Sequence, residues 1–144
     1  MSVTVDTNVL LYASDDASPF HSRALELMEG IARGPEIVYL FWPTLVAYLR
    51  LSTHPAVFER PLPPDRAMAN LDGLLALSHV QSPGERDRFW QIYRDVAEDA
   101  GARGNLVPDA HLVSLMVEND VRAIWTHDRD FRRFNGIDVR DPFA

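Results

Sequence analysis

Short runs of β-branched and aliphatic residues alternate with longer segments whose apolar residues recur at helical spacing, and this alternation is the strongest constraint on the fold. The runs predicted to be strands are Val3–Asp6, Ile37–Phe41, a short segment near Val80, Ala123–Thr126 and Ile137–Val139. Strands separated by helices form mainly parallel sheets that helices cover on both faces. We therefore expect one domain over residues 1–144, an α/β fold in the form of a three-layer α/β/α sandwich with a mainly parallel central sheet.

Capping residues and prolines predict where the helices begin and end. Ser18-Pro19 is expected to open a helix that Gly34-Pro35 stops, and His54-Pro55 is expected to end the helix that Pro43 opens, because a residue before proline avoids the helical region. The other predicted helices are Asn8–Ala13, about Asp65–Leu77, Glu85–Ala102, one that starts at Pro108, and the short Asp128–Phe134.

Composition excludes several classes of protein. The chain has no cysteine, so disulfides, thiolate metal sites and thiol nucleophiles are ruled out. A net charge of −7 argues against broad, sequence-independent binding of nucleic acid. The longest apolar stretch, Ile37–Leu49, is interrupted and too short to span a membrane, and the first residues do not resemble a signal peptide. We expect a cytoplasmic protein.

Three aspartates are expected to meet at one edge of the sheet. Asp6 and Asp128 follow predicted strands, and ligands bind outside the carboxyl ends of parallel strands. Asp109 shares a helical stripe with Leu112 and Met116, which places its carboxylate on the buried face. Each aspartate has a structural alternative, since an acid near the start of a helix caps it or stabilises its dipole. Capping does not explain why three acids converge.

Clustered carboxylates need a cation. Two of them about 4 Å apart repel by roughly 4 kcal/mol at an effective dielectric of about 20. All 14 basic residues are arginine, and none is adjacent to Asp6 or Asp109 in the sequence. A bound divalent cation is the simplest partner, and ligation by oxygen alone favours magnesium, with manganese as a substitute. The five histidines have no metal-binding spacing and are interpreted as packing or surface residues. Such a site is suited to phosphodiester hydrolysis.

Three segments carry a resemblance to a known family. Val5-Asp6-Thr7-Asn8-Val9-Leu10-Leu11, Asn105-Leu106-Val107-Pro108-Asp109-Ala110-His111-Leu112 and Trp125-Thr126-His127-Asp128-Arg129-Asp130-Phe131 resemble, in order and spacing, the acidic motifs of PIN-domain VapC ribonucleases. The resemblance covers essentially the whole chain and implies the PIN-like form of the α/β/α sandwich.

The resemblance also implies roles for individual residues. Asp6, Asp109 and Asp128 would be the catalytic magnesium ligands, directly or through water, with Asp130 as a further or alternate ligand. Asn8 and Thr126 would orient these acids. Asn105 is a weaker candidate for the same task, with a loop asparagine as the equal alternative. The family has a glutamate on the helix after the second strand, and Ala47 stands at that place here, which favours one metal over two.

The function implied is that of a magnesium-dependent endoribonuclease, the toxin of a toxin-antitoxin pair, which cleaves structured cellular RNA. The expected protein partner is a VapB-like antitoxin, and the chain is expected to form a homodimer. Three arginines beside Asp128 are predicted either to contact RNA phosphates or to form a solvated helix face: Arg129, Arg132 and Arg133. The main alternative is a catalytically weakened PIN domain that binds RNA or a protein partner without cleaving. Haloacid-dehalogenase phosphatases and response-regulator receivers also place an aspartate after the first strand of a parallel sheet. Both need a lysine near the phosphoryl group, and this chain has no lysine, so these classes are disfavoured.

Overall fold

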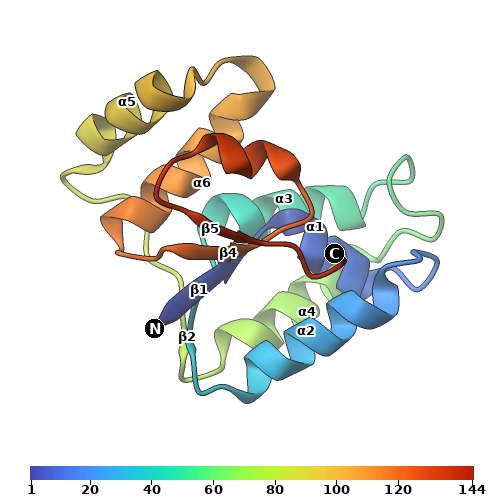
Figure 1. The fold of residues 1–144 in the computed structure, drawn as a ribbon. Coiled ribbons are helices and arrows are strands. Elements are labelled where there is room, and N and C mark those ends of the chain that lie inside the picture. Colours follow the sequence, from blue (N-terminus) through green and yellow to red (C-terminus); the bar gives the residue numbers. More distant parts are fainter.

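Five short strands form one sheet in which every neighbouring pair is parallel. The computed structural model describes residues 1–144, and its strands are Ser2–Val5 (β1), Ile37–Tyr39 (β2), Val80–Gln81 (β3), Ala123–Trp125 (β4) and Asp138–Arg140 (β5). Their order is β3-β2-β1-β4-β5, with β1 at the centre (Figure 1). The expected mainly parallel sheet is confirmed, and it is parallel throughout.

Six α-helices connect the strands. They are Thr7–Ser14 (α1), His21–Arg33 (α2), Trp42–Ser52 (α3), Pro64–Leu75 (α4), Phe89–Ala100 (α5) and Val107–Glu118 (α6), joined by two 3-10 turns, Gly104–Leu106 and Arg129–Arg133. No helix combines the length and the apolar character that a membrane span requires.

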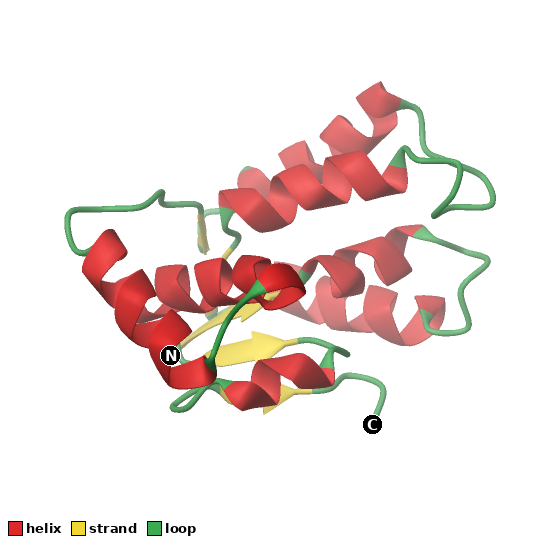
Figure 2. Ribbon diagram, turned by 90° about the horizontal axis from the view of Figure 1, so that it is seen from above, coloured by secondary structure: helices red, strands yellow, loops and turns green.

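Two separate apolar cores lie on the two faces of the sheet. One joins β1 and β2 to buried residues of α1, α2, α3 and α4, among them Val9, Met28 and Tyr48. The other packs α6 and the 3-10 turn Arg129–Arg133 against β4, through residues such as Met116 and Phe131, with α5 over them. In Figure 1 the strands lie between α5 and α6 above and α2 and α4 below, and Figure 2 shows the same elements from above. The expected three-layer α/β/α sandwich is therefore confirmed.

The strand order places the candidate site. From β1 the chain builds outward to β2 and β3, and it then returns to add β4 and β5 on the opposite side of β1. The switch point of the sheet is thus the gap between β1 and β4, where ligands bind in open α/β sheets. Asp6 follows β1 directly and Asp128 follows β4 by three residues, so both lie at this switch point.

Two helices begin later than capping alone predicts. Ser18 accepts a hydrogen bond from the Phe20 amide at 3.1 Å, and this local turn delays α2 until His21. Glu85 and Arg86 contact α6 instead of starting α5: the Glu85 carboxylate lies 2.6 Å from His111, and the Arg86 amide donates to Glu118 at 2.9 Å. These tertiary contacts hold the segment out of the helix.

Candidate metal centre

Asp6 is held by the two strands at the switch point. Its amide donates to the Trp125 carbonyl at 2.9 Å, which continues the pairing of β1 with β4. One carboxylate oxygen accepts from the Thr7 amide at 2.7 Å and caps α1, and the other accepts from the Thr126 hydroxyl at 2.8 Å. Burial raises the pKa of Asp6 above 3.8 in spite of these hydrogen bonds, and the charge of Asp128 acts in the same direction. Asp6 therefore both caps a helix and supplies a partly buried carboxylate.

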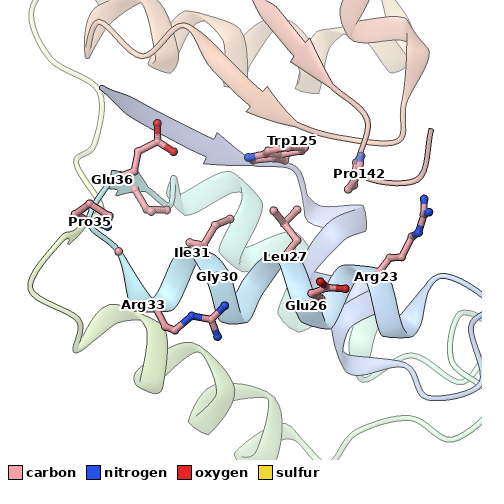
Figure 3. Close-up of a pocket in the computed structure, with 12 residues that line it drawn as sticks. Arg23, Glu26, Leu27, Gly30, Ile31, Arg33, Pro35, Glu36, Trp125 and Pro142 are labelled. Carbon is pink, nitrogen blue, oxygen red and sulfur yellow. The ribbon is translucent and has the colours of Figure 1, made fainter.

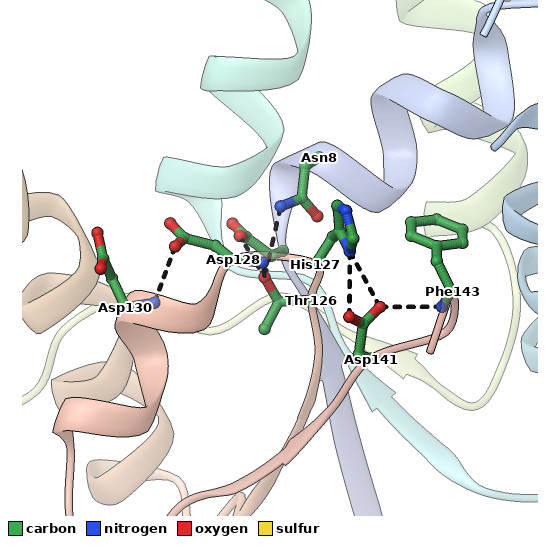
Figure 4. A network of polar contacts seen from close by, with 8 residues as sticks. Asn8, Thr126, His127, Asp128, Asp130, Asp141 and Phe143 are labelled. Carbon is green, nitrogen blue, oxygen red and sulfur yellow. Dashed lines mark hydrogen bonds and ion pairs between the residues drawn. The ribbon is translucent and has the colours of Figure 1, made fainter. Parts of the chain in front are cut away.

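The Thr126 hydroxyl links three residues of the centre. Its single proton goes to Asp6, and its oxygen accepts from the Asp128 amide at 3.0 Å and from the Asn8 side-chain amide at 3.4 Å (Figure 4). One donor and two acceptor positions are all that a hydroxyl has, so Thr126 is fully used. Because the Thr126 proton is used for Asp6, Thr126 is only able to accept from Asn8. The Asn8 side-chain amide must therefore point its nitrogen toward Thr126. The Asn8 Oδ1 atom is buried and has no hydrogen-bond partner.

Three further carboxylates form the tightest acidic group. Asp109, Asp128 and Asp130 each place one oxygen within 4.8 Å of the others. Asp109 comes from the first turn of α6, where Pro108 favours the start of the helix. Asp128 caps the following 3-10 turn by accepting from the Asp130 amide at 2.9 Å, and this turn folds Asp130 back toward Asp128.

Like charge and burial act together on Asp109. Burial, followed by the charges of Asp128, Asp6 and Asp130, raises the pKa of Asp109 to about 7. The four aspartates thus interact electrostatically, although Asp6 is directed to Thr126 and lies outside the tightest group. At neutral pH the centre is strongly negative, although Asp109 is only partly ionised.

No cationic side chain balances this charge. Five ion pairs occur in the molecule, and none includes Asp6, Asp109, Asp128 or Asp130. The donors are all carboxylate oxygens, and the three closest lie near enough to bind one ion together. Hard oxygen ligands of this kind suit magnesium or manganese rather than zinc. The residues present therefore fit a divalent cation.

The remaining predicted site residues lie around this centre or outside it. Arg129, Arg132 and Arg133 are exposed on the 3-10 turn next to Asp128 and take part in no ion pair. Asn105 lies in the 3-10 turn Gly104–Leu106 just before α6, where it is exposed and its side chain makes no hydrogen bond, and its role stays a prediction. Ala47 lies in α3, and that helix contains no acidic residue, so α3 adds no carboxylate to the centre.

Sequence reasoning missed the partner of His127. Its Nδ1 atom lies 3.1 Å from both carboxylate oxygens of Asp141 (Figure 4). Burial works against the charge on Asp141, but hydrogen bonds from the Phe143 amide and from His127 outweigh it and lower the pKa of this carboxyl. The one available hint was that His127 stands between Thr126 and Asp128.

A cavity of about 600 Å³ lies away from the acids, between α2 and the sheet (Figure 3). Leu27, Ile31 and Trp125 contribute apolar surface, and charged side chains such as Arg33 and Glu36 lie at its edge. None of the four aspartates lines it. The acidic centre therefore lies apart from this cavity, at the carboxyl ends of β1 and β4.

Comparison with known proteins places this geometry in a family. The model of the PIN domain matches residues 3–137, which is nearly the whole chain. The chain belongs to the PIN-domain family. Ribonuclease VapC48 of Mycobacterium tuberculosis is 49% identical over 144 residues, a match that covers 100% of this chain and 99% of that protein. This places the chain among the VapC members of the PIN-domain family.

Solved PIN-domain structures share the fold. The crystal structure of Mycobacterium tuberculosis VapC20, described as a toxin that cleaves the sarcin-ricin loop, superimposes with a TM-score of 0.69 at 17% identity, over 96% of this chain and 99% of that one. VapBC2 from Rickettsia felis, bound to a DNA fragment from its promoter, gives a TM-score of 0.67 at 16% identity, over 97% and 98% of the two chains. These likenesses confirm the PIN-like sandwich.

Proposed function

We propose that this PIN-domain protein is a magnesium-dependent endoribonuclease that acts as the toxin of a toxin-antitoxin pair. The observation that carries the proposal is the group of Asp109, Asp128 and Asp130 at the switch point of the sheet, with Asp6 beside it and no cationic side chain to balance the charge. The 49% identity to a protein named ribonuclease VapC48 supports the same activity.

Each of the four carboxylates has its own role at the metal ion. Asp109 and Asp128 would hold the magnesium ion, or manganese in its place, with Asp130 as a further ligand from the same group. Asp6 would complete the set, directly or through water, since it faces the same switch point. When bound, the ion polarises a phosphate oxygen, lowers the pKa of a water molecule and stabilises the leaving oxygen. Thr126 and Asn8 keep Asp6 and Asp128 in register by hydrogen bonds.

The raised pKa of Asp109 gives the centre a defined response to metal. Without metal, burial and then the neighbouring charges raise the pKa of Asp109 to about 7, so Asp109 holds its proton up to about that pH. A carboxylate ligand must be deprotonated to bind, so magnesium binding below this pH releases a proton. Metal affinity should therefore increase with pH up to about 7.

The substrate and partners follow from the family. A structured cellular RNA would lie over the acidic centre, and the exposed Arg129, Arg132 and Arg133 would contact its phosphates. VapC20 is described as cleaving the sarcin-ricin loop, an example of a structured target. The solved VapBC2 complex supports a VapB-like antitoxin as partner. We also propose a homodimer and a cytoplasmic location, as family expectations.

Ala47 is the observation that favours a second candidate function. The absence of any acid from α3 reduces the number of metal ligands, and a catalytically weakened domain would bind RNA or a protein partner without cleaving it. We favour a one-metal nuclease, because the three carboxylates of the tightest group are sufficient to hold one ion.

Cleavage of total RNA by the purified protein tests the proposal. We expect cleavage with magnesium, none with a chelator, and none from Asp109→Asn. Asp72→Asn is the matched control, because Asp72 is exposed on α4 and its side chain makes no hydrogen bond. Binding of RNA without cleavage at any magnesium or manganese concentration would select the weakened domain. Equal cleavage by Asp109→Asn and wild type would overturn the metal assignment.

A further inference from the structure

Four rings pack together next to the loop that carries Asp128, and Figure 4 shows two of them, His127 and Phe143, on the side of Asp128 away from Asp130. They are Tyr12 of α1, Phe20 of the following turn, His127 and Phe143. The Phe143 ring stacks on Phe20 with centroids 4.6 Å apart and meets Tyr12 and His127 edge-on at 5.5 and 5.2 Å. The His127 ring lies 4.9 Å from Phe20. Aromatic pairs of this geometry stabilise a fold by more than the burial of their apolar surface alone.

Asp141 fixes the orientation of the His127 ring. Both of its carboxylate oxygens lie 3.1 Å from His127 Nδ1, and one of them also accepts from the Phe143 amide at 2.9 Å. The Asp141 side chain is 16% exposed and that of His127 is 36% exposed, so water screens the pair less than it screens the exposed ion pairs. We call the contacts of Asp141 and Phe143 with His127, Tyr12 and Phe20 the C-terminal clasp.

The clasp touches both segments that present the acids of the switch point. His127 stands between Thr126, which donates to Asp6, and Asp128, whose amide donates to Thr126. Tyr12 belongs to α1, the helix that Asp6 caps. The contacts of the His127 ring therefore restrain a residue that is joined on one side to Thr126 and on the other to Asp128.

We propose that Asp141 and Phe143 are positioning residues for the metal centre. They fix His127, and His127 fixes the loop 126–128, so that Asp128 stays within reach of Asp109 and Asp130. The inference rests on the proposed function, because it takes Asp128 as a metal ligand. The clasp lies beyond the sheet, since β5 ends at Arg140, so removing it leaves all five strands in place.

Two variants disrupt the clasp from its two sides, and two others serve as controls. Asp141→Ala removes the acceptor of His127, and Phe143→Leu keeps an apolar side chain but removes the ring. Phe143→Tyr keeps the ring. Asp138→Ala removes a different carboxylate of the same C-terminal segment, one that pairs with Arg140 and not with His127.

Magnesium affinity by calorimetry and backbone amide signals by NMR give the two measurements. Loss of a group that orients a metal ligand typically weakens binding about tenfold or more, and we expect this loss in Asp141→Ala and Phe143→Leu. In both, the amide signals of Thr126 and Asp128 should shift before metal is added. Phe143→Tyr and Asp138→Ala should match wild type in both measurements.

The clasp proposal is overturned if Asp141→Ala and Phe143→Leu are folded, bind magnesium as wild type does, and leave the Thr126 and Asp128 signals unmoved. Their contacts then stabilise the fold alone. If Asp141→Ala does not fold, Asp141→Asn gives the same comparison with a smaller change. Wild type that binds no magnesium would instead refute the proposed function, and the amide signals would still decide whether the clasp orders the loop.

Discussion

Replacing Asp109 by asparagine should stabilise the metal-free protein at neutral and alkaline pH. The pKa of Asp109 is 3.8 in the unfolded chain and about 7 in the folded protein. Between these values the folded state binds more protons than the unfolded state, so the free energy of unfolding falls as the pH rises from about 4 to 7. Asparagine cannot ionise and escapes this loss.

The size of the effect follows from the same pKa. A rise from 3.8 to about 7 corresponds to at most roughly 4 kcal/mol, at 1.36 kcal/mol for each pH unit. Asp109 is only half-buried, so solvent screening reduces this to about 2 kcal/mol at pH 8. In a domain of this size that is a rise in Tm of roughly 6 °C. At pH 5 the gain should be less than half as large.

Thermal unfolding followed by circular dichroism between pH 5 and pH 8, with a chelator and then with magnesium, measures this. Wild type should gain stability from magnesium, because the ion binds the folded state alone, while Asp109→Asn should gain little. The order of the two Tm values should therefore reverse when magnesium is added. A metal-free Asp109→Asn that melts below wild type at pH 8 would refute the reasoning and assign Asp109 to stabilising the first turn of α6.

Three further changes test other parts of the centre. Thr126→Val removes the proton that Asp6 accepts, so RNA cleavage should fall by roughly tenfold or more in a steady-state assay, and Thr126→Ser should restore it; equal losses in both would contradict the hydrogen-bond role. Ala47→Glu should enlarge the magnesium-induced rise in Tm and lower the Tm in chelator, and an unchanged rise would mean that this position does not face the acids. The double variant Arg132→Gln with Arg133→Gln should raise KM for RNA with little change in kcat, and RNA binding by this variant should depend less on salt. An unchanged RNA affinity in a filter-binding assay would mean that these arginines form a solvated face.

The parts of the site that could be predicted from the sequence are those that follow from the alternation of strands and helices and from the helical spacing of apolar residues. Asp6 and Asp128 were expected together because parallel strands end at one edge of the sheet, and the structure places both at the gap between β1 and β4. Asp109 was expected near them because it shares a stripe with buried residues of α6. Its coupling to the other acids in the structure agrees with that geometry.

Contacts between distant segments have no such pattern, and these were missed. Glu85 looks like the start of a helix until His111 is seen to bind it. Asp141 is fourteen positions from His127, and no periodicity relates them. In both cases the decisive neighbour lies on another element.

The central position of β1 has a consequence for the folding of the domain. Asp6 directly follows β1, but its partner Thr126 lies 120 positions later in the sequence, and Asp109 and Asp128 also come from segments that follow β3. Contacts of such sequence separation form late, because a long loop must close before they are made. The first carboxylate is therefore in place along the chain long before the others are able to reach it, and the acidic centre forms only as β4 pairs with β1.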